Sequence, residues 1–115
     1  VTERLHMKRL RIVLALCFAG LAWPALAQQE PAMFRGADLK TGAQLIAGNQ
    51  CATCHQRQVG GDGSAIYRPA GRINSPAALV NMVDQCNMRL NLNLFPDEIT
   101  SMAAVLNRRY YHFTK

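Results

Sequence analysis

The chain has 115 residues, half of them hydrophobic, and a formal net charge of +6 at pH 7. Residues 28–115 contain nine basic and six acidic residues, so half of this charge belongs to the first 27 residues. The remaining +3 forms no basic stripe of the kind that binds nucleic acid, and we expect no nucleic-acid partner. Residues 28–115 are sufficient for one domain with a small hydrophobic core.

The first 27 residues have the pattern of a secretory signal peptide. Met7 is the expected initiator, residues 8–11 are mostly basic, residues 12–22 are apolar, and residues 25–27 form an A-x-A cleavage site. The apolar run is shorter than the roughly 18 residues that indicate a membrane span, and no second run follows. We therefore predict cleavage after Ala27, export to the periplasm and no membrane span in the mature chain.

A short polar segment precedes the first predicted helix. Residues 28–37 contain proline and glycine and are expected to be a flexible lead-in to a single domain at 38–115. Asp38 is suited to cap a helix over 39–48. The apolar residues of that helix recur on one side: Leu39, Ala43, Ile46 and Ala47.

The first helix leads directly into a C-x-x-C-H motif, Cys51-Ala52-Thr53-Cys54-His55. This motif is the attachment signature of a c-type haem. Two thiols one helical turn apart can each form a thioether with the same porphyrin, and the adjacent imidazole can then ligate the iron. A thioredoxin-like pair would require a βαβ pattern, and a zinc site would require a second ligand pair, neither of which the sequence offers.

Residues 56–74 contain four glycines and one proline and show no helical period. We expect a loop that covers one edge of the haem, with contacts from Ile66, Tyr67 and Pro69. Gly60-Gly61-Asp62-Gly63 is a weak match to a phosphate-binding loop, because no lysine follows and no helix opens after it.

Two more helices are predicted beyond this loop. Ser75-Pro76 is a strong helix start, and Asn91 to Leu94 end that helix. Pro96-Asp97-Glu98 opens the last helix, with two acidic residues at its positive end. The apolar face of the middle helix consists of Leu79, Val83, Cys86 and Leu90, and that of the last helix of Ile99, Met102, Ala103, Leu106, Tyr110 and Phe113.

Residues 38–113 resemble a small monohaem class I-type cytochrome c. The resemblance implies an all-α fold of three main helices and a glycine-rich loop around one covalent haem c, in which the first and last helices cross. It also implies that Cys51 and Cys54 carry the haem and that His55 is the proximal ligand. We expect the pocket to include Tyr67, Phe95 and Met102.

The second axial ligand is where the sequence departs from that family. The family places a methionine in a loop shortly before the last helix, and Met88 has nearly that spacing here. A helix continuing through residue 88 would, however, place Met88 on its polar side. Cys86 on the apolar face is the alternative ligand, and it can also be a free buried thiol or be paired with another chain. Asn87, or no protein ligand, is a further alternative, whereas Met82 and Met102 are expected to pack in the core.

The function implied is that of a periplasmic electron carrier, without enzymatic activity of its own, that exchanges single electrons with redox partner proteins. The alternatives are a five-coordinate or labile haem protein that binds a small ligand, and a haem subunit of a larger periplasmic oxidoreductase. The acidic residues provide no acid–base pair for substrate chemistry, because they are expected in turns, on the surface or at helix caps.

Overall fold

The computed structural model describes residues 29–68 and 71–115, and the predicted signal peptide and Pro69 lie outside these ranges. The described part is all-helical, as predicted, and contains no strand. Its main elements are α2 (Leu39–Gly48), α3 (Cys51–Val59), α4 (Pro76–Leu90) and α5 (Pro96–Leu106). Three shorter turns complete it: η1 (Ala32–Phe34), η2 (Ser64–Ile66) and the π-helical η3 (Asn107–Tyr111).

The predicted caps define the helix starts. The Asp38 carboxylate accepts a hydrogen bond from the backbone N–H of Thr41 at 3.0 Å and so caps α2. The Ser75 hydroxyl accepts one from Ala78 N–H at 3.1 Å and caps α4. At α5 the Glu98 carboxylate accepts from the N–H of Phe95 at 2.8 Å.

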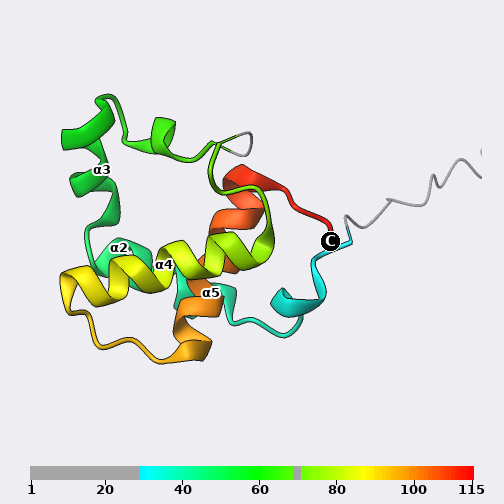
Figure 1. Ribbon diagram of the computed structural model, residues 1–115. Helices are drawn as coiled ribbons and strands as arrows, with labels where there is room; N and C mark the ends of the chain where they lie inside the picture. Colours follow the sequence, from blue (N-terminus) through cyan, green and yellow to red (C-terminus); the bar gives the residue numbers. More distant parts are fainter. Residues whose placement is uncertain (1–28, 69–70) are drawn as a thin grey trace, which may run out of the picture.

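Helices α2 and α5 pack against each other more extensively than any other pair, and α4 packs on α5 from another side (Figure 1). The close approach of α2 depends on Gly42, because a Cβ atom at that position would overlap the carbonyl group of Ser101. The Ser101 hydroxyl also accepts a hydrogen bond from Asp38 N–H at 3.1 Å. The predicted contact between the first and last helices is therefore present.

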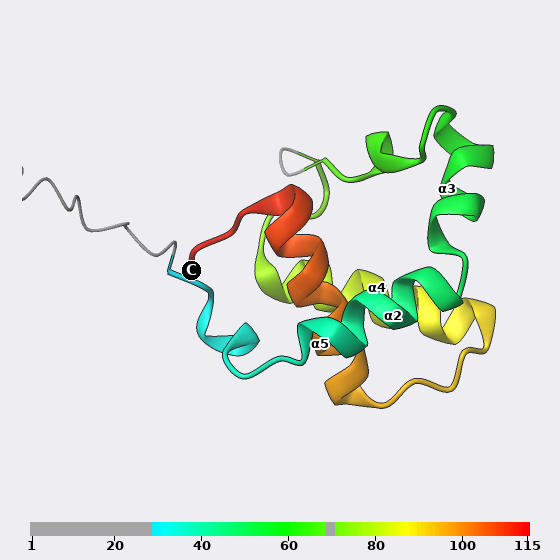
Figure 2. The same ribbon diagram turned by 180° about the vertical axis from the view of Figure 1, so that it is seen from behind.

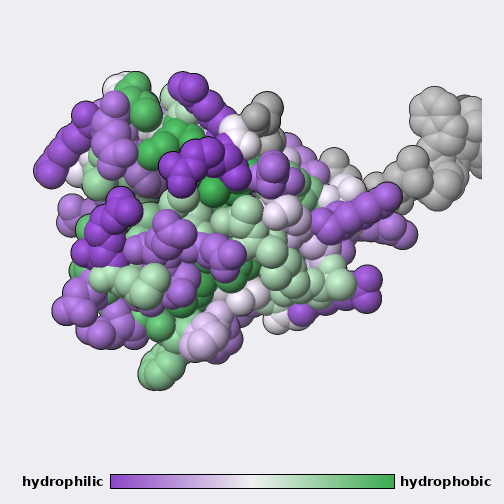
Figure 3. Space-filling view, in the orientation of Figure 1, coloured by the Kyte–Doolittle hydropathy of each residue, from purple (hydrophilic) through white to green (hydrophobic). Residues whose placement is uncertain are grey.

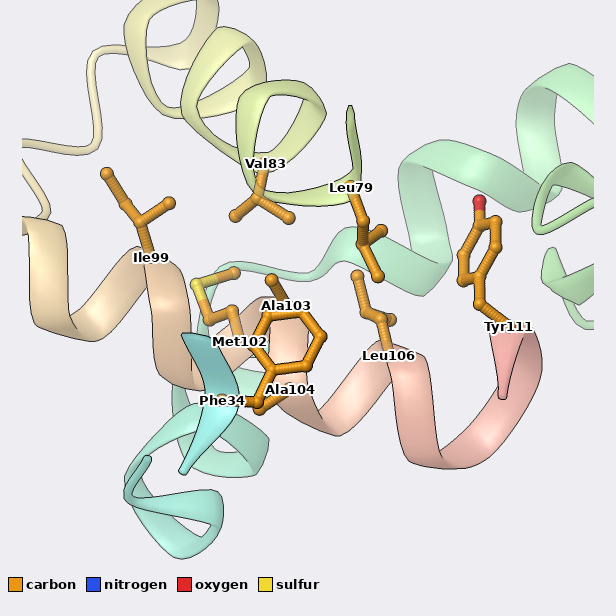
Figure 4. Close-up of a cluster of buried hydrophobic side chains, with 9 residues drawn as sticks. All are labelled: Phe34, Leu79, Val83, Ile99, Met102, Ala103, Ala104, Leu106 and Tyr111. Carbon is orange, nitrogen blue, oxygen red and sulfur yellow. The ribbon is translucent and has the colours of Figure 1, made fainter. Parts of the chain in front are cut away.

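The hydrophobic core surrounds α5, whose residues 101–106 are all buried, as is the following Asn107. Leu79 and Val83 reach it from α4, as Figure 4 shows. Phe34, only 1 % exposed, reaches it from η1. Pro31 and Phe34 are fully buried, so residues 31–34 form part of the domain instead of a flexible lead-in.

Helix α3 is the main departure from the predicted secondary structure. Residues 56–59 continue the helix that begins at Cys51, although we expected a loop from residue 56 onward. The sequence gives no helical period here because no residue of α3 is buried. Figure 2 shows α3 rising away from α2 at the edge of the molecule, with residues 60–68 returning from it.

Candidate haem site

The C-x-x-C-H motif opens onto a cavity of about 280 Å³. Helix α3 forms one side of the cavity wall. The other sides are formed by the end of α2, the segment around Tyr67, α4, α5 and η3. Apolar side chains dominate this wall: Ile46, Ile66, Ile73, Leu79, Val83, Leu90, Leu92, Met102 and Leu106. Figure 3 shows hydrophobic residues between hydrophilic ones on the side of the molecule that carries α3 and the following loop.

The backbone before the motif determines its orientation. Gln50 has a left-handed conformation (φ 52°), which separates α2 from α3 and turns the motif helix in a new direction. Cys51 and Cys54 are three residues apart, and His55 is four residues after Cys51, so all three share one face of α3. All three side chains line the cavity.

Gly63 fixes the following loop against the motif. Its φ of +82° favours glycine, and a Cβ atom at this position would lie 2.8 Å from the carbonyl oxygen of Ala52 and 2.9 Å from the Cβ of His55. The loop backbone therefore contacts the motif helix directly. Sequence reasoning noticed the glycine run but did not assign Gly63 this role, which depends on a tertiary contact.

The environment of His55 suits a neutral imidazole. Burial lowers the pKa of His55 below its ordinary value of 6.5, so the ring is neutral at neutral pH. Its Nδ1 atom is buried and has no hydrogen-bond partner among the residues that the structure describes. An unsatisfied buried nitrogen is costly, and a neutral imidazole is the form that ligates metals.

Three thiols share the cavity, those of Cys51, Cys54 and Cys86. Burial raises the pKa of Cys51 above 9.0, and repulsion from a negative charge at Cys86 raises it further. Burial also raises the pKa of Cys86, whereas the positive charge of Arg89 opposes that shift. At neutral pH these two groups are therefore thiols. The amide of Gln58 lies 3.5 Å from the sulfur of Cys54.

The histidine lies beside a pair of stacked tyrosines. The ring of Tyr67 contacts that of His55 edge-on, with centroids 5.2 Å apart and planes at 81°. Tyr67 also stacks on Tyr110 at 4.4 Å. Burial, the largest cause, raises the pKa of Tyr67 well above its ordinary value, so the phenol remains protonated.

The predicted site residues divide into two groups. Tyr67, Met102 and Cys86 line the cavity together with the motif. Phe95, which was also expected in the pocket, does not line the cavity: it precedes α5 and is 69 % exposed. Met88 is also outside the cavity and 66 % exposed, because α4 continues to Leu90 and places residue 88 on its outer side.

Sequence reasoning missed four cavity residues that carry polar or sulfur groups. Met82 was expected to pack in the core, and Asn49, Gln58 and Arg89 were not considered. Arg89 and Met82 lie three residues after and four residues before Cys86, so helical spacing alone could have placed them beside it.

A second hollow, of about 370 Å³, lies between the N-terminal segment and the end of the chain. It contains an ion pair in which Arg108 donates two hydrogen bonds of 2.9 Å to Glu30. This hollow contains none of the thiols, so we place the site in the apolar cavity.

Comparisons with protein-family models, curated proteins and solved structures gave no match. Within residues 29–68 and 71–115, no helix is long and apolar enough to cross a membrane. In the same residues, no three His, Cys, Asp or Glu side chains are grouped so that they could hold a metal ion by themselves.

Proposed function

We propose that this protein is an exported c-type cytochrome that carries single electrons on one covalently attached haem c. One observation carries the proposal: Cys51, Cys54 and His55 all line the same apolar cavity. A thioredoxin-like pair would have no need of this wide apolar wall beside the two thiols.

The residues present fit a haem. Cys51 and Cys54 offer two thiols on one helical face, and His55 offers a neutral imidazole with an unsatisfied buried nitrogen. The walls beyond them are apolar, as a porphyrin face requires. Arg89 at the edge of the cavity provides a cation for carboxylate groups. When bound, the haem supplies an iron that alternates between the ferrous and ferric states by one electron.

The protein's own groups would set the conditions for this exchange. Two thioether links would fix the cofactor to α3, and His55 would ligate the iron from the same helix. The apolar residues of α4 and α5 would exclude water, which limits solvent reorganisation when the charge changes. Tyr67 would hold the imidazole ring by its edge-on contact. Export, as predicted from residues 1–27, would place the protein where such cytochromes are assembled and meet redox partner proteins.

The test is covalent haem retention. The full chain is co-expressed with a c-type haem maturation system, and its intact mass and its colour after acidified acetone are measured. We expect the mass to exceed that of the mature polypeptide by one haem, and the double variant Cys51→Ala/Cys54→Ala to lose this increment. Cys86→Ala is the matched control, because it removes the third thiol of the same cavity and should leave the covalent link intact. A wild-type protein without bound haem, or a double variant that retains it, would refute the proposal.

The exposed position of Met88 favours one alternative, a haem protein that binds a small ligand. Without a protein ligand on the second side, the ferrous protein would bind carbon monoxide at once. The proposal below concerns that side.

A further inference from the structure

Helix α4 presents its entire predicted apolar face to the cavity. Leu79, Val83, Cys86 and Leu90 all line it. Met88 is two residues beyond Cys86, about 200° around the helix at ~100° per residue. The same helix therefore cannot present both sulfurs to the cavity, and it presents Cys86.

The cavity separates α4 from the helix that carries His55. Helix α3 packs on η2 and α2, whereas α4 packs on α5. Both α3 and α4 nevertheless contribute residues to the cavity wall. The two views in Figures 1 and 2 show these helices apart from each other. His55 therefore opens onto the cavity from one wall and Cys86 from another.

Two methionine sulfurs also line the cavity, and each is placed less favourably. Met102 is only 4 % exposed and belongs to the core around α5. Met82 is at the margin of the α4 face, whereas Cys86 is within the stripe formed by Leu79, Val83 and Leu90. Cys86 also has no hydrogen bond or disulfide in the described structure. An unpaired thiol is unusual in an oxidising compartment and needs an explanation.

We infer that the sulfur of Cys86 is the second axial ligand of the haem iron, on the side away from His55. This inference rests on the proposed function. On binding, the thiol releases its proton to solvent and the thiolate donates to the iron. Burial raises the pKa of the Cys86 thiol, and the positive charge of Arg89, one turn further along α4, opposes part of that shift. Ligation by Cys86 would account for its unpaired thiol and for the exposure of Met88. It would also explain why Cys86 lines the same cavity as the C-x-x-C-H motif.

A thiolate ligand has a distinct redox consequence. It donates negative charge and stabilises ferric iron, whereas a methionine thioether favours the ferrous state. Removing the thiolate ligand should therefore favour ferrous iron. At a fixed ambient redox potential, the ratio of ferrous to ferric protein should rise at least tenfold. For a one-electron couple this corresponds to a rise in midpoint potential of at least about 59 mV.

The test compares holoproteins of four variants: Cys86→Ser, Cys86→Met, Met82→Leu and Met88→Leu. Ferric absorption and electron paramagnetic resonance spectra report the ligand, and potentiometry reports the midpoint. We expect Cys86→Ser to lose the thiolate signature and to have a higher potential. Cys86→Met should keep a sulfur ligand with a higher potential, which preserves the test if the serine variant folds poorly. Met82→Leu and Met88→Leu should have the same ferric spectra and midpoint potential as the wild type.

The outcomes separate this inference from the proposed function. If the haem is covalently bound but Cys86→Ser and Cys86→Met leave the spectrum and potential unchanged, the inference is wrong and the cytochrome proposal stands. A spectral change in Met82→Leu or Met88→Leu alone would assign the ligand to that methionine and would also overturn it. Rapid labelling of Cys86 by a maleimide in the folded wild-type holoprotein would do the same, because a ligating sulfur is blocked.

Discussion

Replacing Gly42 by alanine tests whether the packing of α2 on α5 holds the domain together. The new Cβ would overlap the Ser101 carbonyl group and lie 3.0 Å from the backbone nitrogen of Met102. These are backbone atoms, so no side-chain rotation can relieve the contact, and the two helices must separate. Overpacking of this kind costs about 1–3 kcal/mol, and we place this case at the upper end. Alanine returns about 1 kcal/mol of helix propensity.

We therefore expect Gly42→Ala to destabilise the protein by about 2 kcal/mol, the difference between the cost of about 3 and the gain of about 1. The measurement is urea unfolding of the holoprotein followed by circular dichroism, with the midpoint and slope compared with wild type. Gly48→Ala is the matched control, because it lies in the same helix and its Cβ would meet no atom within 4 Å. Gly48→Ala should be neutral or slightly stabilising. A Gly42→Ala protein as stable as the wild type would refute the close approach of α2 to α5.

Three further predictions concern helix ends and the segment before the motif. Ser75→Ala should lower the free energy of unfolding by about 1 kcal/mol, measured by urea unfolding, because the hydroxyl that accepts the Ala78 N–H is lost. Hydrogen bonds from residue 41 hold the pKa of Asp38 in the folded protein below its ordinary value of 3.8. The Asp38 carboxylate therefore stabilises the folded protein at pH values above 3.8, and this stabilisation is lost as the pH falls through the lower folded-state pKa. The stability difference between wild type and Asp38→Asn should accordingly shrink in acid, and a constant difference would contradict this. Gln50→Gly should raise stability by up to about 1 kcal/mol by relieving the left-handed conformation, whereas Gln44→Gly inside α2 should lower it by about 1 kcal/mol.

The elements with local signals were predicted closely. Helix α2 begins and ends where expected, because Asp38 supplies its cap and the apolar period is clear up to Gly48. Helix α4 likewise begins after Ser75 and ends at Leu90, where Asn91 adopts a left-handed conformation. These signals act between residues that are near in the sequence, so the sequence alone carries them.

The features that depend on tertiary placement were predicted less well. Phe95 was assigned to the pocket as an aromatic residue, but the direction of the chain before α5 depends on left-handed Asn91 and Asn93, and it leaves Phe95 exposed. The spacing before the last helix favoured Met88 as a ligand, whereas the helical period of α4 favours Cys86. The distance to the last helix and the helical period thus favoured different residues. Because α4 extends to Leu90, it places Cys86 on the cavity side.

Helix α3 is the element that attachment of the proposed haem would stabilise most. It has nine residues, no buried residue and no side-chain cap at Gln50, and isolated helices shorter than about 12–15 residues are marginal in water. Among the described residues, its main protein contacts are with Gly63 and η2, with Tyr67 and with the end of α2. A haem attached to the cavity side of α3 would bury that face, so attachment should stabilise this helix more than α5, which the core already covers.

Hydrogen exchange measured by mass spectrometry can test this difference. We expect peptides covering residues 51–59 to exchange faster in the haem-free Cys51→Ser/Cys54→Ser variant than in the holoprotein. Peptides covering residues 99–107 are the internal control and should remain protected in both, because residues 101–107 are buried by protein alone. Equal protection of 51–59 in the two forms would contradict the argument, since it would mean that α3 is stabilised by its protein contacts without the haem.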